Sequence, residues 1–197
     1  MAANLCAEIA AAAARLIVED GMDYGAAKQR AARQFRLGGR SLEMPGNDEV
    51  EDEVRAYLEI FHADTQPQDL AALRRIAALW MERMAAFRPH LAGAVWRGTA
   101  TRLSTIHIDL YCDDSKAAEL ALLNEGVRFE ISSAEGRRER DVDVLNVFER
   151  SDDLGARVRV AMTIHDYDDL RGALRRDGRG RPPRGDLAAL RALQDAP

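Results

Sequence analysis

The sequence has very few cysteines, and this scarcity argues against two kinds of protein. Among 197 residues there are only Cys6 and Cys112. Neither belongs to a Cys-x-x-Cys pair or lies near a histidine at the spacing of metal ligands, so a zinc site is not expected. Two thiols also cannot form the dense disulfide framework of a small secreted domain. We expect both to be buried as small apolar side chains.

Long uncharged apolar runs and an excess of positive charge are missing as well. The alanine-rich start has no basic beginning and contains Glu8, Arg15 and Glu19, so it is typical neither of a signal peptide nor of a membrane span. The formal net charge of −5 disfavours a general affinity for the nucleic-acid backbone. These features predict a cytoplasmic protein whose partners include neither a membrane nor, by default, nucleic acid.

What is present is the composition of a globular protein. Apolar residues make up 47% of the chain and charged residues 31%, a balance that favours a packed core over disorder. The length suffices for one ordinary domain, or for a helical segment joined to a small α/β domain. A large multidomain enzyme is excluded.

Apolar residues recur at helical spacing throughout the first ninety residues. The pattern predicts four amphipathic helices, one ending at Asp20 and the others at about 23–36, 48–63 and 65–87. Pro89 marks the end of this region. Four such helices are more than a small sheet needs to cover one of its faces. We therefore expect some apolar helix surface to be left over and to be covered by a second copy of the chain in a homodimer.

After Pro89 the apolar period changes from helical spacing to alternation. Segments 104–112, 127–132, 141–149 and 156–165 read as strands, and 116–126 reads as a helix with capping residues before it. A short last helix starts at about Asp186. The pattern therefore predicts an α+β protein with a helical region (1–90), a mixed-sheet domain (91–170), and a C-terminal loop and short helix packed on that domain (171–197). We expect the helical region to pack on the sheet as a layer.

The stretch "GAVWRGTATRLSTIHIDL", residues 93–110, carries a family resemblance. It resembles the start of the catalytic domain in small nucleotidyltransferases of the DNA polymerase beta superfamily, which has Gly-Ser, then Arg-Gly on a short helix, then Ser-Asp-x-Asp-Leu on a strand. The resemblance implies a nucleotidyltransferase-like mixed sheet that holds nucleotide phosphates at the glycine turn and Mg²⁺ on paired carboxylates. Carried onto this sequence, the nucleotide-binding residues would be Gly93, Arg97, Gly98, Thr99, Ser104 and Thr105.

This chain departs from that pattern at the positions that carry the chemistry. Thr105 and His107 stand where the family has acids, and Ala94 stands where it has a serine. A hydroxyl and an imidazole are poor substitutes, because Mg²⁺ prefers charged oxygen ligands. The departures predict that the sheet is kept while the metal-dependent transfer is lost.

An alternative register keeps some chemistry. In it Gly98-Thr99 forms the phosphate turn, His107 and Asp109 form the strand pair with Asp109 as the metal ligand, and Glu130 or Asp143 supplies the third acid. Each of these polar residues also has a plain structural interpretation, as an outward-facing strand residue or part of a turn.

The chain also resembles, more loosely, short bacterial proteins that share the phrases "DYGAAKQRAARQ", "FHADTQP" and "RGDLAALRAL". Some of these carry names of cell-wall amino-acid ligases. An ATP-dependent ligase of that kind would be far longer and would contain a Gly-Lys-Thr/Ser phosphate loop, which this sequence lacks.

Two functions therefore stay open. The first is a catalytically silent nucleotidyltransferase fold that binds a nucleotide or a protein partner. The second is a divergent metal-dependent nucleotidyltransferase that uses His107, Asp109 and Glu130, with Mg²⁺ and a nucleotide as ligands.

Overall fold

The computed structural model describes residues 2–35, 44–135 and 141–195. The chain forms two compact units. Unit 1 consists of Met1–Gln68 and Thr99–Leu103, and unit 2 of Asp69–Gly98 and Ser104–Pro197. No helix in the described part of the chain has the length and apolar character needed to cross a membrane.

Unit 1 is built on three helices with their own core. They are α1 (Ala2–Asp20), α2 (Tyr24–Gln34) and α3 (Asn47–Phe61). Gly21 ends α1 with a φ of 64°, a conformation that costs glycine little. Apolar residues from all three helices are buried together, among them Ile9, Ala13, Ala27, Ala31, Val50 and Val54. The helical spacing of the sequence predicts these three helices; the end of the second prediction, from Arg36 on, lies outside the described residues.

A polar contact joins α1 to the end of α3. Glu19 Oε1 lies 3.1 Å from His62 Nε2 and accepts a hydrogen bond of 3.0 Å from the Tyr57 hydroxyl. Together these contacts, His62 first, lower the pKa of Glu19 from its ordinary value of 4.5. A carboxyl group whose pKa is lower in the folded state stabilises the fold above its unfolded pKa, and this contribution is lost as the pH falls through the folded pKa.

We therefore expect Glu19→Gln to lower the melting temperature slightly at pH 7 and to have almost no effect at pH 3. The effect is small because the Glu19 side chain is 45% exposed. Thermal unfolding followed by circular dichroism at the two pH values measures it. Glu59→Gln, which removes the same charge from an exposed position on α3, serves as the control. An equal loss at both pH values would contradict the assignment of this stabilisation to the ionised carboxylate.

Unit 2 contains a six-stranded mixed sheet. Its elements, in chain order after α4 (Gln66–Arg83) and a 3₁₀ turn (Ala85–Phe87), are β1 (His90–Ala92), α5 (Gly93–Arg97), β2 (Ile106–Tyr111), α6 (Ser115–Asn124), β3 (Glu130–Glu135), β4 (Asp141–Ser151), β5 (Ala156–His165), α7 (Asp169–Ala173), β6 (Arg184–Gly185) and α8 (Leu187–Asp195). The strand order is β3-β4-β5-β2-β1-β6. Among the strand pairs of the described residues, only β2 and β5 run parallel. The predicted α+β class with a mixed sheet is confirmed.

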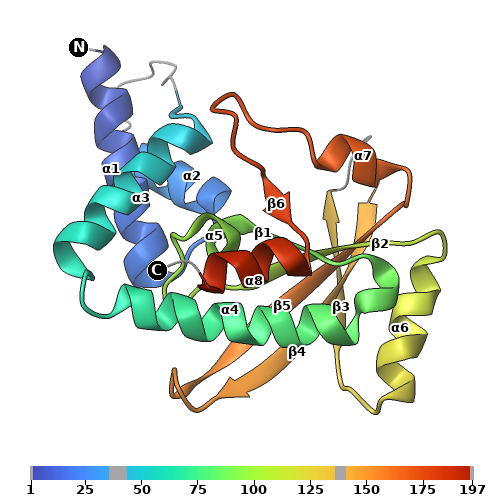
Figure 1. The fold of residues 1–197 in the computed structure, drawn as a ribbon. Helices are drawn as coiled ribbons and strands as arrows, with labels where there is room; N and C mark the ends of the chain where they lie inside the picture. The colour runs from blue at the N-terminus through green and yellow to red at the C-terminus, as the bar shows by residue number, and fades with distance from the viewer. Residues whose placement is uncertain (1, 36–43, 136–140, 196–197) are drawn as a thin grey trace. The chain divides into compact units, whose positions relative to one another are not determined.

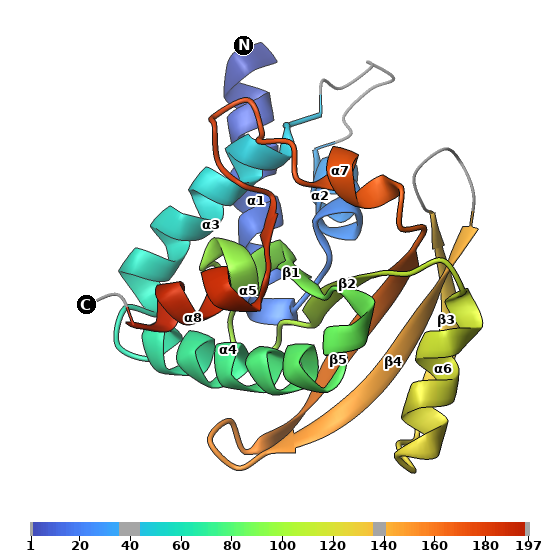
Figure 2. The same ribbon diagram turned by 45° about the vertical axis from the view of Figure 1, so that its right-hand side comes forward.

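The two faces of this sheet differ in character. On β2, Ile106, Ile108 and Leu110 are fully buried and project to one face. The helices α4, α6 and α8 lie on one side of the sheet (Figures 1 and 2), and ion pairs of Arg83 with Glu125 and of Arg191 with Glu82 tie α4 to the other two. The opposite face carries His107, Asp109 and Tyr111.

The structure divides the chain differently from the sequence pattern. The predicted helical region ends at residue 90, whereas α4 from Asp69 onward belongs to the unit that contains the sheet. The reason is its apolar stripe, in which Leu73, Trp80 and Met81 are buried. The C-terminal segment does more than pack on the domain, because β6 pairs with β1 as an edge strand. The short elements β1, α7 and β6 have too few residues to show a period.

Candidate functional site

The glycine turn of the resemblance lies directly against the polar face of β2. β1 ends at Ala92, and Gly93 then takes a φ of 67° and starts α5. A Cβ atom on Gly93 would lie 3.3 Å from His107 Cδ2, so the turn backbone approaches the histidine ring closely. Gly98 ends α5 with a φ of 81°. The structure thus brings the predicted residues Gly93 and His107 together.

Alternation along β2 places the predicted site residues on one face. His107 lies opposite Ala92 on β1 and Ala161 on β5, and Asp109 lies opposite His90 and Thr163. Thr105 immediately precedes the strand and is half-buried, as is Ser104. Successive residues of this face are about 6.8 Å apart along the strand.

Asp109 is held by two side chains that the sequence does not connect to it. Its Oδ1 lies 3.2 Å from His165 Nε2 on β5, and its Oδ2 accepts a hydrogen bond from Arg184 Nη1 on β6. Arg184 Nη1 also donates to the Tyr111 hydroxyl at 2.7 Å. The Asp109 side chain is only 12% exposed. This carboxylate is therefore part of a buried ion pair with further hydrogen bonds.

Aromatic rings complete this group. The Tyr111 ring stacks on His165 at 5.3 Å between centroids and lies perpendicular to the His90 ring at 5.5 Å. The His90 Nδ1 atom lies 2.9 Å from the carbonyl oxygen of Arg88. We name the five side chains His90, Asp109, Tyr111, His165 and Arg184 the Asp109 cluster. Four adjacent strands contribute to it, at the end of the sheet where the parallel strands β2 and β5 finish.

Other predicted residues lie elsewhere. Glu130 is exposed on β3, three strands away from β2, which corresponds to about 14 Å across the sheet. Asp143 projects to the face of the sheet opposite to Asp109. Its strand neighbour Val144 pairs with Thr163, which lies beside Asp109, and successive residues of a strand point to opposite faces. The structure does not bring either acid to Asp109.

Three predicted nucleotide-binding residues, Thr99, Arg97 and Gly98, lie outside the Asp109 cluster. Thr99 belongs to unit 1 and is 2% exposed, and its Oγ1 has no hydrogen-bond partner in the described part of the chain. Arg97 is the last residue of α5 and Gly98 follows it, both in unit 2 and both half-buried. Their assignment to nucleotide binding stays a prediction.

A cavity of about 1270 Å³ lies at another part of unit 2. It is lined by the β4–β5 hairpin and by residues of α4 and β3, including Glu130. Its arginines are partly engaged, since Arg83 pairs with Glu125 and Arg157 lies over the Phe148 ring at 5.0 Å. The carboxylates of Glu130, Glu149 and Asp152 line it as well, so it has no single charge sign. We place the candidate site at the Asp109 cluster, because specific polar contacts converge there.

The thiol at the end of β2 does not add a nucleophile. Partial burial raises the pKa of Cys112, and the carboxylates of Asp114 and Asp113 raise it further. A thiol with a raised pKa stays protonated at neutral pH and reacts slowly.

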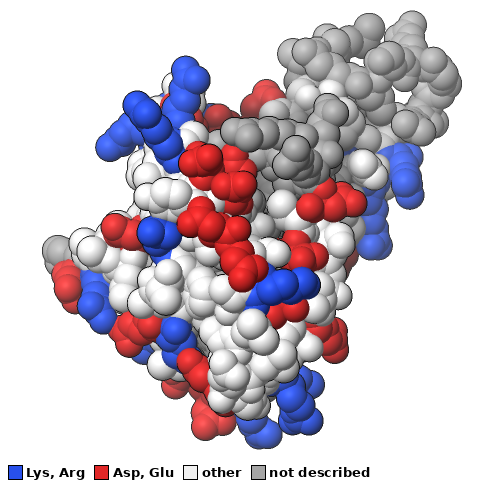
Figure 3. Space-filling view, turned by 90° about the vertical axis from the view of Figure 1, so that its right-hand side faces the viewer, with Lys and Arg blue, Asp and Glu red and all other residues white. Residues whose placement is uncertain are grey.

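Exposed acids follow both parallel strands, β2 and β5, and Figure 3 shows carboxylates gathered on the side of the molecule where α6 lies.

The residues present do not fit a divalent metal ion. Mg²⁺ takes charged and neutral oxygen ligands in octahedral geometry. On the polar face of β2, Thr105 offers a neutral hydroxyl, His107 an imidazole, and Asp109 a carboxylate already paired with Arg184. Within the described ranges, no three His, Cys, Asp or Glu side chains are grouped so that they could hold a metal.

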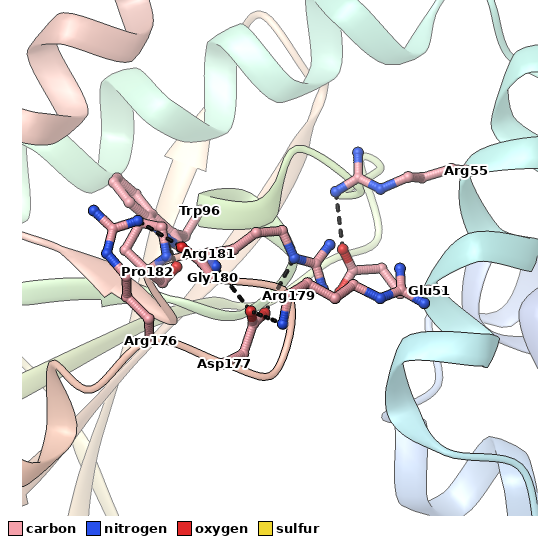
Figure 4. Close-up of polar contacts among 9 residues, drawn as sticks. All are labelled: Glu51, Arg55, Trp96, Arg176, Asp177, Arg179, Gly180, Arg181 and Pro182. Atoms are coloured by element: carbon pink, nitrogen blue, oxygen red, sulfur yellow. Dashed lines mark hydrogen bonds and ion pairs between the residues drawn. The ribbon is translucent and has the colours of Figure 1, made fainter.

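The segment that leads into β6 is anchored beside the glycine turn. The Trp96 indole on α5 donates to the carbonyl oxygen of Pro182 at 2.9 Å. A Cβ atom on Gly185 would lie 2.2 Å from the Trp96 ring, so only glycine allows this contact. Figure 4 shows Trp96 beside Pro182 and the turn around Asp177. The sequence does not point to Arg184, which lies 75 residues from Asp109, because a lone arginine in a Gly/Pro/Arg loop gives no signal for such a contact.

Comparisons with known proteins give only a weak structural likeness. No family model matches the chain, and no curated protein matches it. A solved structure, described as Cid1 in complex with the UTP analog UMPNPP, is similar at 13% sequence identity with a TM-score of 0.34. The match covers 58% of this chain and spans 36% of that one. So weak a likeness shows nothing about ligands or catalysis in this chain.

Proposed function

We propose that the protein is a catalytically silent nucleotidyltransferase-fold protein that binds a nucleotide or a protein partner at the Gly93 turn and the polar face of β2. The observation that carries the proposal is the approach of Gly93 to His107. It supports the register of the resemblance, in which Thr105 and His107 occupy the positions of the metal-binding acids. The absence of acids at these positions removes the ligands on which metal-dependent transfer relies.

The alternative, a divergent enzyme built on His107, Asp109 and Glu130, has less support. The two-metal chemistry requires carboxylates within a few ångströms of the same ions. Glu130 lies three strands from Asp109, and Asp109 is paired with Arg184. A nucleotide and Mg²⁺ remain the ligands to test for this alternative, and a homodimer remains the expected assembly.

We expect nucleoside triphosphates to raise the melting temperature of the protein, because a ligand that binds only the folded state stabilises it. A thermal-shift screen of the four common ribonucleoside triphosphates, each at a saturating concentration, should show a shift for at least one of them. No nucleotidyl transfer to an acceptor should be detected with Mg²⁺ or Mn²⁺. Transfer activity that is abolished by Asp109→Asn would contradict the proposal that the protein is catalytically silent. A screen without any shift would rule out nucleotide binding and leave binding of a protein partner.

A further inference from the structure

The charge of Asp109 is already neutralised within unit 2. One oxygen of the carboxylate faces His165 and the other accepts from Arg184. A guanidinium keeps its positive charge over the whole useful pH range. Arg184 therefore occupies the side of Asp109 that a divalent cation would need, and no negative charge of Asp109 is left over to attract a metal.

Arg184 also retains donor capacity. A guanidinium has five N–H groups, and both hydrogen bonds to Asp109 and Tyr111 come from Nη1. The Nε–H is buried and has no hydrogen-bond partner among the described residues. The side chain as a whole is 19% exposed. Phosphate oxygens are the acceptors that the planar edge of a guanidinium binds best, through two parallel hydrogen bonds.

The chain before Arg184 is strongly basic. Residues 171–184 contain six arginines and one aspartate, a formal charge of +5 in a protein of net charge −5. The single acid, Asp177, forms its hydrogen bonds with residues of the same segment. Its carboxylate accepts from the backbone N–H of Arg181 at 2.8 Å and of Arg179 at 2.9 Å, and these bonds, Arg181 first, lower the pKa of Asp177 (Figure 4).

This basic segment has a defined conformation. Arg176 Nη1 donates to the carbonyl oxygen of Gly180 at 2.5 Å, and Asp177 and Gly180 close a turn through backbone hydrogen bonds. The Trp96 contact with Pro182 then fixes the segment next to α5. Positive charge is thus held beside the Gly93 turn, and little backbone entropy of the segment remains to be lost when an anion binds.

We propose that the Asp109 cluster and the basic segment bind the phosphates of a nucleotide as a metal-free anion, with Arg184 donating hydrogen bonds and the basic segment supplying the charge that a divalent cation would otherwise supply. This rests on the proposed function, and it names the form of the ligand: a free triphosphate, not its magnesium complex. Inorganic triphosphate has the same phosphate groups without the nucleoside, so it serves as a second probe beside the nucleotide.

The test is isothermal titration of the full chain with a ribonucleoside triphosphate and, separately, with inorganic triphosphate, each in EDTA and in excess Mg²⁺. We expect binding in EDTA at least as tight as in Mg²⁺, because the basic segment provides cations and the Asp109 carboxylate is already paired with Arg184. Arg184→Met, which keeps the length of the stem and removes the charge, should weaken binding by about tenfold. Arg150→Met removes the same charge from an exposed position on β4 and should leave binding unchanged.

A second variant gives an effect of opposite sign and guards against a folding defect in Arg184→Met. Asp109→Asn removes a negative charge from beside the proposed anion and should tighten binding by about threefold at low salt. If Asp109 were a metal ligand, the same change would weaken binding in Mg²⁺.

The outcomes separate this inference from the proposed function. Nucleotide binding that requires Mg²⁺ would overturn the inference and leave nucleotide binding standing. No binding in either condition would overturn both metal-free binding and the nucleotide form of the proposed function. Inorganic triphosphate that binds as tightly as the nucleotide would support the metal-free anion site and count against recognition of a nucleoside.

Discussion

The Gly185→Ala variant is expected to lose about 1–3 kcal/mol of unfolding free energy, because a methyl group at this position would overlap the ring of Trp96. The nearest ring atoms would lie 2.2, 2.4 and 2.8 Å from the new Cβ atom. The ring cannot move away without losing its hydrogen bond to the Pro182 carbonyl. Gly185 does not have a positive φ, so the expected loss is steric and not a backbone effect.

Urea unfolding followed by far-UV circular dichroism measures this loss, and a double-mutant cycle identifies its cause. In a Trp96→Ala background the obstructing ring is gone, so Gly185→Ala should cost almost nothing further. Gly178→Ala is the matched control, because a Cβ atom there meets nothing within 4 Å. If Gly185→Ala costs the same with and without Trp96, the contact between the ring and β6 is not the reason for the glycine.

The strands that could be predicted are those with enough residues to show alternation. The expected strand at 156–165 is β5, and the expected strand at 104–112 contains β2. Both have a buried apolar face, and burial on one face is what produces the period of two. The three-residue β1 and the two-residue β6 show no period, and they become strands only because β2 offers an edge on which they pair.

The candidate site divides in the same way. Alternation on β2 places Thr105, His107 and Asp109 on one polar face, and the family resemblance implies the Gly93 turn beside them. The partners of Asp109 could not be predicted, because His165 and Arg184 reach it only through strand order and register. A polar residue on a strand gives the same signal whether it faces solvent or a buried ion pair.

The Thr105→Asp, His107→Asp double variant is expected to remain folded and to bind Mn²⁺ about tenfold more tightly than the natural protein. Neither position carries the packing of β2, which rests on the fully buried Ile106, Ile108 and Leu110. Both side chains are half-buried on the polar face, so two carboxylates there can reach solvent and a cation. Without metal, the two new charges and Asp109 repel one another, and the variant should melt at a lower temperature.

Calorimetric titration with Mn²⁺ and Mg²⁺ measures the gain, and melting with and without metal tests its coupling to stability, since a bound ion should restore the lost stability. The Thr105→Asn, His107→Asn variant is the control for shape without charge and should gain little. Transfer activity need not return, because Ala94 still lacks a hydroxyl group and Asp109 stays paired with Arg184. Tight Mg²⁺ binding by the natural protein, abolished by Asp109→Asn, would instead show that the existing residues already form a metal site.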